Sequence, residues 1–395
     1  QRLQLLVDVV HAGARRELAE DDVGVAPADL GQAEVGERVD RVDAHAGVVE
    51  GGAVAHLLHR RLRPVHLALN VVAGGAGFIG SHLCRALLDR GESVLCLDNL
   101  QTSRPSNLRA LEGQPRFRFL RHDISQPLPA ELLRLAPRIT RVWNLACPAS
   151  PPHYQRDPEH TMLTNVVGTN NLLHLAEAAK ARFLLTSTSE VYGDPEIHPQ
   201  AEDYRGNVSC TGPRACYDEG KRAAEALAFD YARMGRAQVR VARIFNTYGP
   251  NMDPNDGRVV SNLICQALRG DELTVYGDGS QTRSFCYVSD MVAGLMALME
   301  ADIDGTEPVN LGNPHEMTVN ELLGHVLELT GTRARVVHRP LPVDDPRRRR
   351  PDISRARALL DWAPRVPLAE GLQATCAWFA EELVQDQPAA AGIPG

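Results

Sequence analysis

Lysine is almost absent from this chain of 395 residues, because only Lys180 and Lys221 of its 42 basic residues are not arginine. Arginine can supply positive charge anywhere on a protein surface, so we infer that a lysine is kept where its compact ammonium is needed. Lys221 follows Tyr217 by four residues, and residues at positions i and i+4 share one face of a helix. The spacing predicts that the phenol and the ammonium point into one cleft, where the charge lowers the pKa of the tyrosine from about 10.

Other features of the chain are also missing. No apolar run approaches the ~20 residues of a membrane-spanning helix. The eight cysteines include no C-x-x-C pair and no histidine at zinc-ligand spacing, which favours free thiols in a reducing compartment and no metal site. The net charge of −8 and the scattered arginines, apart from the run at 347–350, argue against nucleic acid as a partner. We expect a cytoplasmic enzyme with no nucleic-acid or membrane partner.

The first 69 residues have an unusual composition. They contain no Lys, Ser, Thr, Asn, Ile, Met, Cys or aromatic residue. Such a segment offers little material for a core and lacks the usual helix caps. We interpret residues 1–66 as an atypical extension, either a reading-frame or start-site artefact or a disordered or helical segment without chemistry. The folded domain is expected to begin near His66.

A glycine-rich turn carries the strongest structural motif. Glycines at 74, 77 and 80 follow a short apolar strand and precede a helix expected over 81–90. This spacing permits a tight turn, the close approach of a pyrophosphate to the helix N-terminus and the packing of helix on strand. A second apolar strand, expected over 93–97, ends at Asp98, an acid suited to ribose hydroxyls and unsuited to a 2′-phosphate. The motif predicts a dinucleotide fold that binds NAD in preference to NADP.

The chain then alternates between strand and helix patterns. Further strands are expected over 117–120, 141–146 and 183–186, and a long helical segment over 158–180. This alternation predicts an α/β fold, a Rossmann-like doubly wound parallel sheet. The hydroxyl-rich run from Thr186 to Glu190 follows a strand, and catalytic residues of such sheets lie beyond the carboxyl ends of the strands. The glycine turn, the hydroxyl run and the Tyr217 helix therefore predict one crevice.

Several long runs of sequence between about residues 68 and 384 match those of a known family. The runs are GGAGFIGSHL, ACPASPPHYQ, TSTSEVYGDPEIHPQ, GPRACYDEGKRAAE, RVARIFNTYGP, DGRVVSN, TVYGDGSQTRSFCYVSD, NLGNP and RRRPDI. In these runs the chain is similar to the extended short-chain dehydrogenases/reductases, and within them to the UDP-glucuronate decarboxylases (UDP-xylose synthases). The resemblance implies an NAD-binding Rossmann domain at 67–245, a smaller C-terminal α/β domain for the nucleotide sugar mainly at 246–385, and a flexible tail at 386–395.

The resemblance implies a reaction and catalytic residues. UDP-glucuronate would be oxidised at C4 by NAD, with Tyr217 as the base, Thr188 sharing its hydrogen bond and Lys221 holding the nicotinamide ribose. The C4 ketone is β to the C6 carboxylate, so carbon dioxide is lost, and protonation at C5 with return of the hydride gives UDP-xylose. Ser189 and Glu190 would lie near C5 and the carboxylate. Arg349 would reach in from the C-terminal domain to position or protonate the intermediate.

The resemblance also implies binding residues and an assembly. Asn246, Arg258 and Arg283 would bind the UDP part of the substrate, whereas Tyr276 and Tyr287 are expected in the core. A homodimer through the helices around 160–180 and 213–235 is expected. The residues implied in cofactor binding are Gly74, Gly77, Phe78, Ile79, Gly80, Asp98, Asn99, Thr102, Asp123, Ile124, Leu145, Thr164, Tyr217 and Lys221.

Three other functions stay open at this point. A UDP-glucuronate 4-epimerase would keep the carboxylate, and Ser189-Glu190 with the RRRPDI run argues against it. A nucleotide-sugar 4,6-dehydratase would carry an Asp-Glu pair directly after the catalytic threonine, where this chain has Ser189-Glu190. A non-catalytic binding protein for NAD or a nucleotide sugar on the same fold would be expected to lack Tyr217 or Lys221, and both are present.

Overall fold

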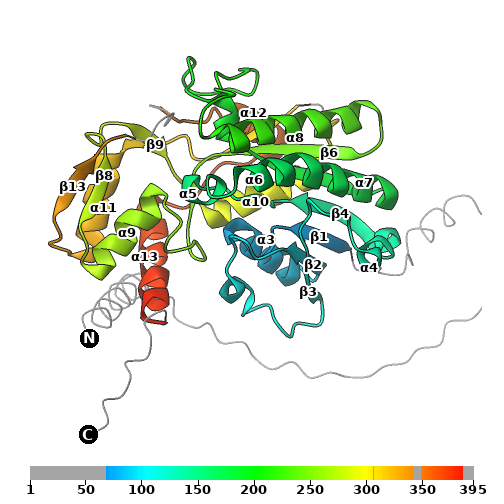
Figure 1. The fold of residues 1–395 in the computed structure, drawn as a ribbon, viewed down its shortest axis with the longest axis horizontal. Helices are drawn as coiled ribbons and strands as arrows, with labels where there is room; N and C mark the ends of the chain where they lie inside the picture. Colours follow the sequence, from blue (N-terminus) through cyan, green and yellow to red (C-terminus); the bar gives the residue numbers. More distant parts are fainter. Residues whose placement is uncertain (1–67, 306, 342–347, 386–395) are drawn as a thin grey trace, which may run out of the picture. The chain divides into compact units, whose positions relative to one another are not determined.

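The computed structural model describes residues 68–305, 307–341 and 348–385. Its largest sheet has seven strands, and helices lie against this sheet (Figure 1). The predicted N-terminal extension, the predicted tail at 386–395 and Arg347 lie outside the described residues. The strand order is β11-β6-β5-β4-β1-β2-β3 and each neighbouring pair is parallel, which confirms the predicted doubly wound sheet. The strands are β1 Leu69–Ala73, β2 Ser93–Asp98, β3 Phe117–Arg121, β4 Ile139–Asn144, β5 Arg182–Thr188, β6 Gln238–Ile244 and β11 Val309–Leu311.

The central strands β1 and β2 are buried on both faces, which explains why they are largely apolar, whereas the edge strand β3 is largely exposed and carries two arginines. In β1, Val71 and Ala73 belong to one hydrophobic cluster, and Val72 between them belongs to another. Helices α7 (Thr169–Ala179) and α8 (Ala215–Arg233) contribute to the first cluster, and α3 (Phe78–Asp89) and α10 (Val288–Glu300) to the second. The side chains of each strand thus alternate between two helical layers.

The predicted elements are present, but their ends differ from the observed ones. The helix predicted over 81–90 begins three residues earlier, at Phe78, and the strands predicted over 93–97 and 117–120 are each one residue longer. The strand predicted over 141–146 runs from Ile139 to Asn144, and the one predicted over 183–186 extends to Thr188. The long helical segment is found as α6 (Pro158–Leu163), a π-helical turn over Thr164–Gly168, and α7. Element boundaries carry weaker sequence signals than the elements themselves, because capping and tertiary contacts decide them.

Helix α8 turns one face toward the sheet. Its buried residues Tyr217, Lys221, Ala224, Ala228 and Tyr231 recur at intervals of three and four. This spacing places them in one stripe along the helix. The prediction that Tyr217 and Lys221 share a helical face is confirmed.

A second group of elements packs around its own hydrophobic cluster. It contains α9 (Val259–Arg269), α11 (Val319–Thr330) and α13 (Leu368–Gln385), with the parallel strands β8 (Leu273–Tyr276) and β13 (Val336–Arg339) and the antiparallel strands β9 (Thr282–Ser284) and β12 (Glu316–Thr318). Helix α10 and strand β11 come after α9, β8 and β9 in the chain, but α10 packs on the seven-stranded sheet and β11 is one of its strands.

No helix among the described residues has the length and apolar character to cross a membrane.

The glycine turn between β1 and α3 leaves no room for a side chain at Gly74 or Gly80. Gly74 has a φ of +77°, in the left-handed region that favours glycine. A Cβ on Gly80 would lie 2.1 Å from the Gly74 carbonyl oxygen and 2.8 Å from the Gly75 Cα. The first turn of α3 can therefore lie directly against the loop.

Replacement of Gly80 by alanine tests this packing. Gly80→Ala should lower the free energy of unfolding by roughly 1–3 kcal/mol, because the added methyl group overpacks the turn, and should weaken NAD binding. Gly324→Ala is the matched control, since a Cβ at this position in α11 meets no heavy atom within 4 Å. It should be neutral or stabilising by up to about 1 kcal/mol. Urea unfolding of both variants makes the comparison, and equal stability of the two would refute the packing argument.

Candidate active site

The carboxyl ends of four neighbouring strands open into a cleft of about 680 Å³. Its lining includes Gly74 after β1, Leu145 after β4, Thr188 at the end of β5 and Asn246 after β6. A smaller cavity of about 70 Å³ shares Gly74 with the cleft and continues along the ends of β2 and β3. The crevice predicted from the sequence is present where the strand order places it.

All the predicted site residues line these two cavities, although their individual roles stay predictions. The larger cleft is lined by Gly74, Gly77, Phe78, Ile79, Gly80, Thr102, Leu145, Thr188, Ser189, Glu190, Tyr217, Lys221, Asn246, Arg258, Arg283 and Arg349. The smaller cavity is lined by Asp98, Asn99, Asp123, Ile124 and Thr164 together with residues shared with the cleft. Among the described residues no cluster of histidine, cysteine and acidic side chains could hold a metal ion.

Tyr217 is buried between an aromatic ring and a hydroxyl group. Its ring stacks on that of Tyr154 with centroids 5.1 Å apart, and its side chain hydrogen-bonds with Thr188. The ammonium of Lys221 lies 5.9 Å from the centroid of the Tyr217 ring and donates a hydrogen bond of 2.9 Å to the Thr186 carbonyl. Tyrosine, lysine and threonine thus meet at the end of β5.

The predicted lowering of the Tyr217 pKa is wrong for the polypeptide alone. Burial raises the pKa of Tyr217 above its ordinary value, the neighbouring Cys147 thiol raises it further, and the hydrogen bond with Thr188 opposes them only in part. Burial also lowers the pKa of Lys221. Spacing in a sequence shows which groups are neighbours. The pKa of a buried phenol is set mainly by its loss of contact with solvent, which depends on the whole fold.

Glu190 sits between two arginines. Arg349 Nη1 donates a hydrogen bond of 2.7 Å to Glu190 Oε1, and Arg214 Nη2 donates to Oε2. All three side chains line the cleft and are at least 85% buried, with exposed fractions of 8%, 8% and 15% for Arg349, Arg214 and Glu190. Burial disfavours the ionised carboxyl, but the charges of Arg349 and Arg214 outweigh it and hold the pKa of Glu190 well below its usual range.

Arg214 was not predicted as a site residue. It lies in the run GPRACYDEGKR, but 24 residues separate it from Glu190, and no spacing rule connects the two. Its backbone carbonyl accepts hydrogen bonds from the amides of Tyr217 and Asp218, so it also starts the helix that carries Tyr217. The position just before this helix was the only available signal.

The predictions for Tyr276 and Tyr287 can be compared with the structure, whereas the predicted binding of UDP by Arg258 and Arg283 stays a prediction. Arg258 pairs with Asp256, and Arg283 Nη1 donates a hydrogen bond of 2.8 Å to the Thr282 carbonyl. The prediction that Tyr276 lies in the core is wrong, since it is 41% exposed and lines the cleft. Tyr276 ends β8, where alternation along the strand turns it away from the buried side. Tyr287 packs against the core as predicted.

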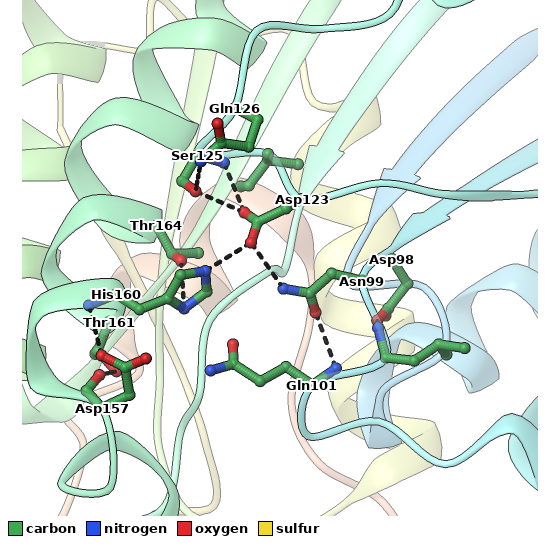
Figure 2. Close-up of polar contacts among 12 residues, drawn as sticks. Asp98, Asn99, Gln101, Asp123, Ser125, Gln126, Asp157, His160, Thr161 and Thr164 are labelled. Carbon is green, nitrogen blue, oxygen red and sulfur yellow. Dashed lines mark hydrogen bonds and ion pairs between the residues drawn. The ribbon is translucent and has the colours of Figure 1, made fainter.

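The smaller cavity contains a polar network (Figure 2). The Asp98 carboxylate accepts hydrogen bonds from the amides of Ala76 (3.0 Å) and Leu100 (2.8 Å) and from the Ser103 hydroxyl (2.9 Å). Asp123 Oδ2 lies 2.6 Å from His160 Nε2, a neighbour that was not predicted. Burial opposes ionisation of Asp123, but its hydrogen bonds, those from Ser125 first, lower the pKa of Asp123 to about 2.

These cavities fit a dinucleotide. The N-cap of α3, Gly77, makes no side-chain cap hydrogen bond, so the first amides of the helix are free of such a cap where a pyrophosphate would bind. Asp98 at the end of β2 is suited to ribose hydroxyls. Tyr217 and Lys221 line the larger cleft, the end of the crevice away from Asp123. The fold and the site define an NAD-dependent enzyme of the short-chain dehydrogenase/reductase type.

Comparison with known proteins gives the family. The model of the NAD dependent epimerase/dehydratase family matches residues 70–312, and the chain belongs to this family. The chain is 52% identical over 316 residues to UDP-glucuronic acid decarboxylase 1 of Arabidopsis thaliana, covering 80% of this chain and 71% of the relative. It is 51% identical over 313 residues to UDP-glucuronic acid decarboxylase 1 of Danio rerio, covering 79% and 73%. Within the family the chain groups with the UDP-glucuronic acid decarboxylases.

A solved structure of an epimerase is also similar. It is the UDP-glucuronic acid 4-epimerase from Bacillus cereus in complex with UDP-glucuronic acid and NAD, with a TM-score of 0.72 and 30% sequence identity. The similarity covers 80% of this chain and 99% of the epimerase. The epimerase is therefore a more distant relative in sequence than the two decarboxylases.

Removal of the Glu190 charge tests the ion-pair arrangement. Glu190→Gln leaves two buried guanidinium groups without their carboxylate, so the free energy of unfolding near neutral pH should fall by about 3–5 kcal/mol. The folded pKa of Glu190 lies below the unfolded value of about 4.3, so this stabilisation is present above that pH and is lost as the pH falls through the folded pKa. The gap between wild type and variant should therefore shrink below about pH 4.

Glu219→Gln is the matched control for this measurement. Glu219 lies on the same helix as Tyr217 and its side chain is 34% exposed, paired with Arg222 at 3.4 Å. Exposed pairs of this kind contribute little, so the control should change the free energy of unfolding by less than about 0.5 kcal/mol. Urea unfolding across pH provides the values. Equal losses in both variants would show that Glu190 is not the stabilising centre.

Proposed function

We propose that this chain catalyses the NAD-dependent decarboxylation of UDP-glucuronate to UDP-xylose. The observation that carries the proposal is the position of Glu190. Its carboxylate is held by Arg214 and Arg349 in the same cleft in which Tyr217 hydrogen-bonds with Thr188. The similarity to UDP-glucuronic acid decarboxylases over four fifths of the chain supports the same reaction.

The first stage is oxidation at C4 of the sugar. Tyr217 takes the proton of the C4 hydroxyl, and Thr188 keeps the phenol in place through their hydrogen bond. Lys221 donates to the Thr186 carbonyl, so its ammonium is held near the phenol and stabilises the phenolate that develops. The glycine turn and Asp98 would hold NAD, which would supply the hydride acceptor for oxidation at C4 and the donor for its reduction.

The second stage is loss of the carboxyl group. A C4 ketone is β to the C6 carboxylate, so the carbanion left by carbon dioxide is delocalised as an enolate. Arg349 lies in the cleft and, among the described residues, its Nη2 has no hydrogen-bond partner, so it can hold the carboxylate or the enolate. Glu190 stays ionised because its pKa is held low, and its carboxylate orients Arg349. Arginine stays protonated in proteins, so Arg349 holds a water beside C5, and this water passes on to C5 the proton that the reaction takes up.

The rival reactions fit the residues less well. A 4-epimerase must keep the carboxylate and turn the ketone, and the epimerase of known structure shares 30% identity with this chain, against 52% for a decarboxylase. A 4,6-dehydratase needs an acidic residue where Ser189 stands. A binding protein without catalysis has no need for Tyr217 hydrogen-bonded with Thr188 beside a lysine.

The assembly and the compartment are part of the proposal. We propose a homodimer through α7 and α8 and a cytoplasmic location, the latter because all eight cysteines are free thiols in the structure. Light scattering of the purified chain should give about twice the mass of 43.2 kDa. A monomer at all concentrations would contradict the dimer.

Incubation of the purified chain with UDP-glucuronate and NAD tests the reaction. Release of carbon dioxide with a UDP-pentose and no accumulating NADH is expected, followed by mass spectrometry and proton NMR. A product of unchanged mass would favour the epimerase. Absence of any reaction would favour another substrate or the binding protein.

Tyr217→Phe tests the assignment of the base. The variant should lose turnover by at least about 100-fold, because the proton of the C4 hydroxyl has no acceptor, while NAD stays bound. Tyr204→Phe is the matched control, since Tyr204 does not line the cleft and its hydroxyl accepts a hydrogen bond of 3.2 Å from the Glu196 amide. Full activity in Tyr217→Phe would contradict the assignment of Tyr217 as the base.

A further inference from the structure

Asp218 is a buried acid without a role in the reaction described above. It follows Tyr217 on α8, is 7% exposed and does not line the cleft. Its Oδ1 has no hydrogen-bond partner among the described residues. A buried carboxylate oxygen without a partner is costly, so the group is expected to depend strongly on the charges around it.

The surroundings of Asp218 are a cluster of charges. Burial and the charge of Glu190 together raise the pKa of Asp218 to about 7, against the opposing charges of Arg214 and Arg349. Other titratable neighbours are Glu219 and Cys216 on α8 and the phenols of Tyr154 and Tyr217. Arg258 also interacts with Glu190, but its charge is balanced by its ion pair with Asp256. With Asp218 ionised, the two arginines balance the two carboxylates. The cluster then has no positive charge left for a third carboxylate.

A substrate carboxylate brought to Arg349 adds that third negative charge. Like charges in a buried site disfavour joint ionisation, so one of the three acids must take a proton. Glu190 is held ionised by direct hydrogen bonds from both arginines, whereas Asp218 has an oxygen without a partner. Asp218 is therefore the acid that takes up the proton.

We propose that binding of the substrate carboxylate beside Glu190 is coupled to the uptake of one proton by Asp218. The inference rests on the proposed function, because it requires a uronate in the cleft. Asp218 does not line the cleft, so it does not touch the substrate. It acts through its electrostatic interaction with Arg214 and Arg349.

The proton balance of the reaction gives this coupling a purpose. Decarboxylation breaks the C5–C6 bond, releases neutral carbon dioxide and leaves the electron pair on C5, where a C5–H bond then forms. The step consumes one proton, and binding has already brought one proton into the cluster. With Asp218 protonated while a substrate carboxylate or enolate is present, and ionised after C5 is protonated, the cluster is neutral at every stage.

Calorimetry of the chain loaded with NADH tests the coupling. The reduced cofactor cannot accept the C4 hydride, so this form of the chain should bind UDP-glucuronate without turning it over. Titrations at about pH 8 in two buffers of different ionisation enthalpy should report uptake of about half to one proton per UDP-glucuronate. Above about pH 7 the Kd should rise by up to about tenfold per pH unit, because binding then competes with loss of the proton. UDP-xylose, which has no carboxylate, should bind without uptake.

Two variants locate the proton. Asp218→Asn should abolish both the uptake and the pH dependence of the Kd while NADH stays bound, and Glu219→Gln, its neighbour on the helix, should retain both. Uptake that persists in Asp218→Asn, or binding by the wild type without uptake, would overturn the inference and leave the decarboxylase intact. A wild type that decarboxylates no UDP-glucuronate would instead overturn the proposed function.

Discussion

The ion pair between Glu190 and Arg349 is the interaction on which the rest of the site depends. It joins the end of β5 to a segment 159 residues later in the chain, and both side chains are buried. A buried charge is stable only with a partner, so each group fixes the position of the other. Because Arg214 holds the second oxygen of the same carboxylate, the start of α8 and therefore Tyr217 are tied to the pair.

Charge balance in this cluster also explains why a uronate suits the cleft. Two guanidinium groups face one fully ionised carboxylate and one acid that can be neutral. A neutral sugar would leave this balance unchanged, whereas a carboxylate engages Arg349 directly. The same groups therefore serve recognition of the substrate and stabilisation of the charge that forms after carbon dioxide leaves.

Much of the fold follows from local patterns in the sequence. The glycine turn, the apolar strands and the i, i+4 pair of Tyr217 and Lys221 are each confined to a few residues, and each was predicted. The ends of β4 and β5 and the π-helical turn at 164–168 were not, because tertiary contacts decide them. The resemblance to a family supplied Arg349, which no spacing rule connects with Glu190.

The missed groups are those whose importance comes from distant neighbours. Arg214, Asp218 and His160 owe their positions to contacts across the fold, and Tyr276 is exposed because of the face of β8 on which it lies. The error in the Tyr217 pKa has the same origin. The sequence shows that a lysine is near, but only the packed structure shows that burial has the largest effect on the pKa of Tyr217.

The central claim is that this single chain oxidises C4, removes the carboxyl group and reduces C4 again. Conversion of UDP-glucuronate that carries deuterium at C4 tests it most directly. We predict a UDP-pentose that retains the deuterium at C4 when the reaction runs in ordinary water. Loss of the deuterium to solvent, or a product that still carries the carboxyl group, would contradict the claim.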